Sequence, residues 1–296
     1  MCLHYIIFYF IGCLTTERVS PLSASKSSLS EDSLCLGLFE VCQALEFLHQ
    51  AGVCHGNVSQ LSIYVSQDGR WRLGGLESVS SATDGALAKD IQALGLVISE
   101  ILANCKEEQS VKFRDFAKNS LLLPDIKRIP SSKDILQDDY FQQSFVKIFQ
   151  FLVKFPVQSE EEREKFFQTC TDQLKCLSPE TVATHLVPHL LSRYIMIDSR
   201  SQDDIVPNIL IPQSSTPPLG VDPILPLHLY HSHVVPQLKL LFSVPDTNIR
   251  LTLLKIWPNF VTHIPEVICN YGINCMLNIE LLPPVDIKLN KQNVNC

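Results

Sequence analysis

The apolar residues in the first half of the chain follow three patterns. Between residues 30 and 50 they recur at the spacing of one helix face: Leu34, Leu38, Val41, Cys42, Leu45 and Leu48. Two short runs, 63–65 and 71–73, flank an Asp-Gly turn, which predicts a β-hairpin. Residues 90–103 are apolar on nearly every face, which predicts a buried helix.

After residue 144 the pattern changes to amphipathic helices, which we predict at 145–155, 159–177, 178–197, 204–210, 227–243 and 246–264. Ser159 followed by three glutamates, and Ser178 followed by Pro179, are typical helix starts. The motif H-[LV]-V-P-x-L begins at His185 and again at His233, 48 residues later, which predicts a repeated helical unit. Residues 265–296 lack a helical period, and we expect an irregular tail there.

The N-terminal residues add one predicted strand to these elements. Residues 5–13 are apolar, aromatic and β-branched, which favours a strand. The run has no basic start and is too short to cross a bilayer, so we expect no transmembrane segment. A cleaved or membrane-inserted segment is the alternative.

Composition and charge narrow the classes of function. The 296 residues carry a formal net charge of -7, and the Lys and Arg residues are scattered, which argues against a nucleic-acid partner. The eleven cysteines form no C-x-x-C pair, so we expect reduced thiols in the cytosol. The histidine groups have no Cys or carboxylate at ligand spacing, and we predict no metal site at His185, His189, His228, His231 and His233.

Residues 48–77 carry the candidate chemistry. A loop that begins with His55 follows the first helix, and a Gly pair follows the hairpin. Protein kinases place H-R-D-x-x-x-x-N and D-F-G there, because one Asp accepts the substrate proton while the Asn and the other Asp hold Mg²⁺. The spacing from His55 is the same, but Asn57 takes the place of the catalytic Asp, Ser62 that of the Asn and Gly75 that of the metal-binding Asp.

Three further segments resemble protein kinases. D-I-Q-A-L-G from Asp90 is similar to the D-x-W-S-L-G that opens the buried helix of a kinase C-lobe, and residues 15–19 resemble the hinge. Arg128 resembles the Arg that pairs with the Glu of A-P-E, but the fourteen residues between Gly75 and Asp90 contain no A-P-E. We therefore expect Arg128 to be exposed or to recruit another acid, such as Asp90, Asp115 or Asp125.

With L-G-G-L-E after a Trp-containing strand and H-G-N in the loop, the chain resembles the Scy-like pseudokinases, and within them a member that associates with ezrin. The resemblance implies a degenerate kinase domain joined to HEAT repeats, and most of the kinase N-lobe would be absent here. It also implies a role in Golgi-associated traffic or in ezrin-linked adhesion and migration. The implied partners are proteins such as ezrin or vesicle-coat components.

We predict a mainly α fold, with a kinase-like C-lobe remnant in 1–140, a short HEAT-type α-solenoid in 141–264 and an irregular tail in 265–296. With Asn57 and Gly75 at the two Asp positions, we predict no catalytic, cofactor-binding or metal-binding residue and no cofactor. The predicted function is a non-catalytic scaffold in the cytoplasm, at the Golgi or at cell-edge protrusions. The alternative is a residual ATP-binding serine/threonine protein kinase.

Overall fold

The computed structural model describes residues 19–22, 29–66, 69–213 and 217–276. The strand predicted at 5–13 lies outside these ranges, as does the predicted hinge except for its last residue, Val19. The chain divides into two compact units, Met1–Lys147 (unit 1) and Ile148–Cys296 (unit 2). The predicted domain boundaries at 140/141 and 264/265 stay predictions.

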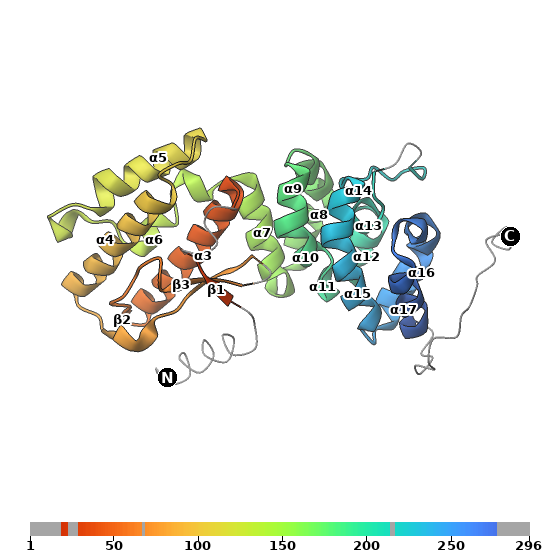
Figure 1. Cartoon of the computed structure of the whole chain (residues 1–296), viewed down its shortest axis with the longest axis horizontal. Coiled ribbons are helices and arrows are strands. Elements are labelled where there is room, and N and C mark those ends of the chain that lie inside the picture. Colours follow the sequence, from red (N-terminus) through yellow and green to blue (C-terminus); the bar gives the residue numbers. More distant parts are fainter. Residues whose placement is uncertain (1–18, 23–28, 67–68, 214–216, 277–296) are drawn as a thin grey trace. The chain divides into compact units, whose positions relative to one another are not determined.

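Unit 1 combines short strands with helices (Figure 1). Its elements are β1 (Val19–Pro21), α3 (Glu31–Gln50), β2 (Val53–Cys54), β3 (Ile63–Ser66), β4 (Trp71–Leu73), β5 (Ser80–Ser81), α4 (Asp84–Ile101), α5 (Glu108–Phe116) and α6 (Ser132–Ile135). A π-helical segment (Ala117–Leu121) follows α5, and short 3-10 turns lie at Leu76–Ser78, Ile126–Arg128 and Asp139–Phe141. Helix α7 (Ser144–Lys154) crosses the boundary between the units.

Helix α3 confirms the prediction for residues 30–50. The Ser30 side chain accepts a hydrogen bond from the N–H of Ser33, and two acids lie in the first turn, so the sequence caps the helix where it begins. All six apolar residues that gave the periodic pattern are buried. Burial of this apolar face therefore fixes the orientation of helix α3 against the core.

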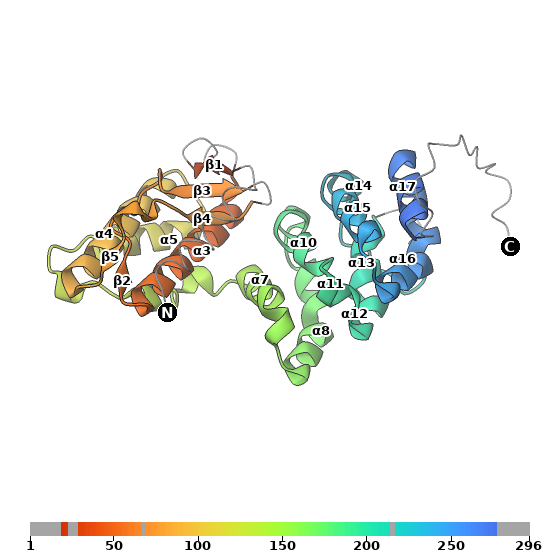
Figure 2. The same cartoon turned by 90° about the horizontal axis from the view of Figure 1, so that it is seen from below.

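The predicted hairpin is also confirmed. Strand β3 pairs antiparallel with β4, and Ile63 lies opposite Leu73; β1 pairs with the other edge of β3. Figure 2 shows β3 and β4 beside α3. Strand β4 contacts α3 through the Trp71 ring, which lies against the backbone of Gly37. A second, two-stranded sheet joins β2 to β5.

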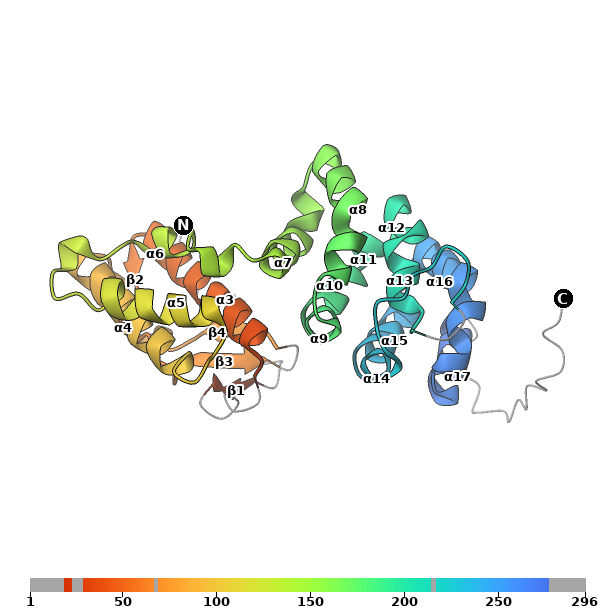
Figure 3. The same cartoon turned by 90° about the horizontal axis from the view of Figure 1, so that it is seen from above.

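Helix α4 begins earlier than the predicted 90–103. The Thr83 side chain accepts a hydrogen bond from the N–H of Ala86 at 3.2 Å, so this cap starts the helix at Asp84, within a stretch that is too polar to show an apolar period. Helices α5 and α6 were not predicted. In Figure 3, α5 lies alongside α4, and Gly95 of α4 packs against Leu121 just after α5.

Unit 2 is helical in its described residues. Its elements are the C-terminal part of α7, α8 (Glu160–Lys175), α9 (Pro179–Thr181), α10 (Val187–Leu190), α11 (Arg193–Met196), α12 (Ser199–Asp203), α13 (Ile205–Leu210), α14 (Leu227–Leu229), α15 (Val235–Ser243), α16 (Thr247–Phe260) and α17 (Glu266–Met276). The predicted helix starts are confirmed at Ser159, which forms a capping box with Glu162, and at Ser178. The predicted helix 178–197 ends earlier, because the helical path breaks after Leu190 and α11 begins after Ser192.

The repeated motif has the same backbone form in both copies. A π-helical segment, Val182–Leu186 in one copy and Tyr230–Val234 in the other, ends just before the Val-Pro pair of the motif. Proline has no N–H, and its ring clashes with the carbonyl four residues earlier, so a wider turn accommodates it. The two π-helical segments contact each other, which makes this motif a repeated packing unit.

The structure differs from the predicted irregular tail at its first residues, where α17 forms a helix. Gly272 of α17 lies so close to Phe242 of α15 that a Cβ on the glycine would be 2.7 Å from the ring. Packing against α15 therefore stabilises a segment whose own period is weak. The other predicted tail residues, 277–296, lie outside the described part of the chain.

Further observations concern the described residues of both units. Among the described residues, no helix is both long enough and apolar enough to cross a membrane. The eight cysteines of the described residues are free thiols, and burial raises the pKa of Cys35, Cys42 and Cys170. The mainly α fold class is confirmed by the helices of both units.

Candidate functional site

His55 joins the loop after β2 to the Gly pair after β4. The side chain is fully buried, and its Nε2 lies 2.8 Å from the carbonyl oxygen of Gly74. The backbone N–H of Asn57 donates to Nδ1 at 3.2 Å, which assigns the hydrogen to Nε2. Burial lowers the pKa of His55, so the ring is neutral and serves as a structural link. We call residues 55–62 the pseudo-catalytic loop.

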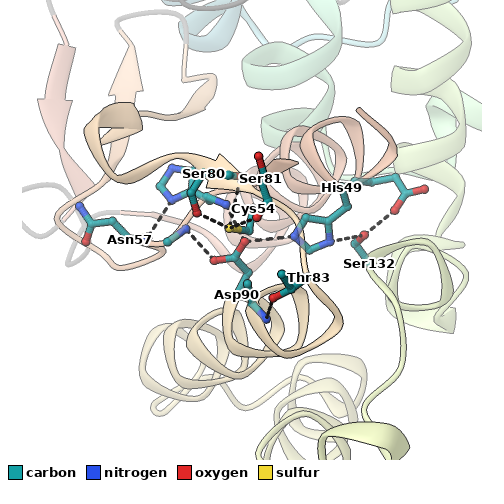
Figure 4. Close-up of polar contacts among 12 residues, drawn as sticks. His49, Cys54, Asn57, Ser80, Ser81, Thr83, Asp90 and Ser132 are labelled. Carbon is teal, nitrogen blue, oxygen red and sulfur yellow. Dashed lines mark hydrogen bonds and ion pairs between the residues drawn. The ribbon is translucent and has the colours of Figure 1, made fainter. Parts of the chain in front are cut away.

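Asp90 of α4 holds the beginning of this loop (Figure 4). Its carboxylate accepts from the backbone N–H groups of His55 at 2.6 Å and Gly56 at 2.8 Å, and it lies 3.2 Å from His49 Nε2. Asp90 is almost fully buried. Burial by itself raises the pKa of Asp90, but the hydrogen bonds from His49, Gly56 and His55 hold it below its usual value. The loop is therefore anchored by an ionised carboxylate.

Asn57, which the sequence spacing predicts in place of the catalytic Asp, is exposed. Its amide Nδ2 donates to Glu77 Oε1 at 3.3 Å. An amide cannot take up the proton that a carboxylate base accepts from a substrate hydroxyl. The structure thus pairs the amide of Asn57 with Glu77.

Ser62, which the sequence spacing predicts in place of the metal-binding Asn, uses its hydroxyl inside the loop. Ser62 is buried, its Oγ donates to the Ser59 carbonyl oxygen at 2.8 Å, and the Ser59 N–H donates to Ser62 Oγ at 2.9 Å. These two bonds close a local turn. The Ser62 hydroxyl therefore stabilises the loop through these hydrogen bonds, a role that the sequence did not indicate.

Two glycines bring the segment after the hairpin close to the pseudo-catalytic loop. Gly75 has φ +75°, and a Cβ there would lie 3.0 Å from Ser62 Cβ and 3.1 Å from Asn57 Nδ2. Gly56 has φ +74°, and a Cβ there would lie 2.7 Å from the carbonyl oxygen of Ser78. A side chain at either position would be strained by its backbone and crowded by its neighbours.

The residues present do not fit a magnesium–nucleotide site of the protein-kinase type. Magnesium in such sites is held by carboxylate and amide oxygens, whereas this loop offers Gly75 and a Ser62 hydroxyl that is already bonded. The nearby carboxylate of Glu77 accepts from Asn57. Within the described residues, no group of three or more His, Cys, Asp and Glu side chains gathers at ligand distance.

Arg128 is exposed, which confirms one of its two predicted outcomes. Its predicted acidic partners are engaged elsewhere. Asp90 holds the pseudo-catalytic loop, Asp115 lies 3.7 Å from Arg114, and Asp125 accepts from the N–H of Lys127. The guanidinium is therefore solvated at the end of a short 3-10 turn.

The histidines of unit 2 are not brought together as a ligand set. The His189 ring lies edge-on to Phe149, and His231 Nε2 lies 2.7 Å from the His263 carbonyl oxygen. Burial lowers the pKa of His233. These contacts are those of packed and surface histidines in a helical unit.

Sequence reasoning missed the polar contacts behind Asp90. His49, the last but one residue of α3, lies between Asp90 and Ser132 of α6, and Ser132 in turn hydrogen-bonds Glu46 (Figure 4). Ser132 is more than eighty positions away from His49 and from Glu46, so no local pattern connects them. The one signal in the sequence is the Leu-His pair that ends the first helix.

The hairpin and the anchored loop together define a protein-kinase-like site in which Asn57, Ser62 and Gly75 carry no carboxylate. No family model matches the chain. A mouse protein, "protein-associating with the carboxyl-terminal domain of ezrin", is 29% identical to this chain. The match covers 89% of this chain and 42% of the mouse protein. The "probable inactive serine/threonine-protein kinase scy1" of Dictyostelium discoideum is 20% identical to this chain, and the match covers 81% of this chain and 33% of that protein.

These matches confirm the resemblance of the chain to the Scy-like pseudokinases. It spans less than half the length of either relative. Among solved structures, the crystal structure of Cex1p aligns with a TM-score of 0.44 and 18% identity, over 89% of this chain and 59% of that one.

Proposed function

We propose that the chain is a non-catalytic pseudokinase scaffold that presents protein-binding surfaces. One observation carries the proposal: the three positions that hold the proton acceptor and the metal in protein kinases are occupied by Asn57, Ser62 and Gly75. The two polar side chains are already hydrogen-bonded within the site. Phosphoryl transfer depends almost wholly on metal and charge placement, so this arrangement leaves little to catalyse with.

Titration calorimetry with ATP, with and without Mg²⁺, tests this part of the proposal. The scaffold requires no magnesium-dependent binding, whereas a residual serine/threonine kinase requires it. An active protein kinase under the same conditions is the positive control. Magnesium-dependent binding together with transfer of the γ-phosphate to a protein substrate would refute the scaffold proposal.

The proposed partners are proteins. Because one relative is named for its association with the carboxyl-terminal domain of ezrin, we propose that domain as the first partner to test. The helices of unit 2, which we propose to be HEAT-type repeats, offer exposed leucines on α16: Leu251 is 59% exposed and Leu254 is 45% exposed. Exposed apolar side chains on a rigid helix are suitable contacts for a partner.

Binding of the purified ezrin domain should be measured by surface plasmon resonance on the full chain. We expect Leu251→Glu combined with Leu254→Glu to weaken binding by about tenfold or more. Leu96→Glu, a matched change at an exposed helical leucine of unit 1, is the control and should leave binding unchanged. If the native chain, the double variant and the control bind with equal affinity, α16 is not the binding surface. If the native chain does not bind, the ezrin domain is not the partner.

The cellular location is a further part of the proposal. A scaffold related to this family is expected at the Golgi or at cell-edge protrusions, where it would act in vesicle traffic with coat components or in adhesion and migration. Fluorescence imaging of the tagged full chain beside Golgi and ezrin markers tests the location. A uniform distribution that follows neither marker would contradict it.

A further inference from the structure

A tight turn lies between α13 and α14. The backbone N–H of Val221 donates to the Pro218 carbonyl oxygen at 3.1 Å, and Gly220 has φ +78°. A positive φ at the third residue is typical of a type II turn, and glycine adopts it without strain. Leu219, the second residue of the turn, has a relative exposure of 105%, the highest among the large apolar side chains of the described residues. The fold itself therefore gains no burial from the Leu219 side chain.

Residues 217–219, which we call the Pro-Pro-Leu segment, favour one turn of polyproline II helix. Each proline ring fixes φ at about −65°, and Pro217, because it precedes a proline, is kept out of the helical region. The second residue of a type II turn has φ of about −60° and ψ of about +120°, so Leu219 is extended as well. Polyproline II has about three residues per turn and no internal hydrogen bonds, so a partner can reach its side chains.

Buried hydrogen bonds hold the residues that follow this segment. Asn208 of α13 is buried; its Oδ1 accepts from the N–H of Asp222 at 2.8 Å, and its carbonyl oxygen accepts from the N–H of Ile224 at 3.1 Å. Asn208 Nδ2 donates to Asp204 Oδ1 at 3.0 Å, and the other Asp204 oxygen accepts from the Thr171 hydroxyl of α8 at 2.7 Å. The Asn208 amide therefore fixes the backbone after the turn to α13 and, through Asp204, to α8.

Further contacts support the same backbone. Lys175 Nζ of α8 lies 2.8 Å from the Asp222 carboxylate, and the N–H of Gln213 donates to the Leu225 carbonyl oxygen at 2.9 Å. The side chains of Ile224 and Leu225 are buried. The base of the turn is thus fixed while its tip is exposed. A binding segment that is already ordered loses little conformational entropy when a partner binds it.

A single exposed leucine is common on protein surfaces and by itself indicates no partner. Here the leucine follows two prolines on a turn that buried polar groups hold in place. We propose that the Pro-Pro-Leu segment binds a protein domain with an aromatic-lined groove, of the kind that recognises polyproline II segments. The aromatic side chains of such a groove pack against the proline rings and the leucine side chain. This site is separate from α16 and goes beyond the proposed contact with ezrin, so each can fail without the other.

Titration of ¹⁵N-labelled domains with the unlabelled full chain tests the binding. The probes are a panel of purified WW and SH3 domains, whose ligand grooves are lined by aromatic residues. We expect saturable shifts in the groove of at least one domain, and Leu219→Asp and Pro217→Ala should each weaken that binding by about tenfold or more. Leu240→Asp, a matched change at an exposed leucine of α15, should leave the affinity unchanged. The proposal is overturned if no domain binds, or if Leu219→Asp binds as tightly as the native chain.

Gly220→Ala tests the role of the turn without changing a residue of the Pro-Pro-Leu segment. A Cβ at Gly220 would have no neighbour within 4 Å, so the strain of a positive φ is the effect that remains. The turn would then be populated for a smaller fraction of the time, and we expect the affinity to fall by about fivefold. Gly69→Ala is the matched control, because Gly69 has φ +79° and the same open space but lies in unit 1. Equal affinity of the two glycine variants would overturn the claim that the fixed turn presents the segment.

Discussion

The packing of β4 on α3 makes Gly37→Ala an informative change. Alanine in the middle of a helix is normally more stable than glycine by about 1 kcal/mol. At Gly37, however, the new Cβ would lie 2.1 Å from Trp71 Cδ2 and Cε2. Carbon atoms in ordinary contact are about 3.5 to 4 Å apart, so the ring and the helix would have to separate by more than an ångström.

The Trp71 ring has little freedom to move away. The ring is buried, the backbone N–H of Trp71 donates to Glu40 Oε2 at 2.7 Å, and Trp71 lies opposite Val65 in the β3–β4 ladder. Overpacking of a core costs about 1 to 3 kcal/mol and occasionally more. With so large an overlap we expect a net loss of about 2 to 3 kcal/mol in the free energy of unfolding, even after the gain in helix propensity.

Gly85→Ala is the matched control, because Gly85 also lies in a helix and a Cβ there would have no neighbour within 4 Å. It should be neutral or stabilise by up to about 1 kcal/mol. Urea unfolding in a Trp257→Phe background measures both changes, since Trp71 fluorescence then reports on unit 1 alone. Similar midpoints for the two variants, without a change in slope, would show that Trp71 does not pack on α3 as described.

The remaining predictions concern the site. Arg128→Ala should change the free energy of unfolding by less than about 1 kcal/mol, because the guanidinium is exposed; a loss above about 3 kcal/mol in the same urea assay would reveal a buried partner. The pKa of Asp90 is lowered on folding, so its contribution to stability should be complete above about pH 4 and lost as pH falls through the lowered value. Urea titrations at several acidic pH values should show this loss in the native chain and a weaker one in Asp90→Asn. Asn57→Asp combined with Gly75→Asp should give no γ-phosphate transfer, because Ser62 stays bonded to Ser59 and the new side chain at Gly75 is strained; transfer that needs both changes would refute this.

Local signals predicted the elements that their own sequence caps and buries. Helix α3 carries its cap at Ser30 and its apolar face within twenty residues, and the hairpin carries its own turn. Helix α17 could not be predicted in this way. Its asparagines and Gly272 weaken the helical pattern, and it is the close contact of Gly272 with Phe242, far away in the sequence, that makes the glycine suitable there.

The same distinction between local sequence signals and distant contacts applies to the candidate site. The spacing from His55 singled out Asn57, Ser62 and Gly75, and the loop and the hairpin bring these three residues close together. What their side chains do could not be predicted. The bond from Ser62 to Ser59, the approach of Ser78 to Gly56 and the contact of Ser132 with His49 depend on folded geometry.

The groups present and the groups missing at this site have different physical roles. Asp90 and His55 satisfy backbone groups that are buried with them, so removing either would leave unpaired polar atoms in the interior, at a cost of about 1 to 3 kcal/mol for each group. The carboxylates of an active kinase, in contrast, act on a metal and a substrate and need not support the loop. Here Asn57 and Ser62 make local bonds instead. The pseudo-catalytic loop therefore keeps its hydrogen-bonded shape without catalytic carboxylates.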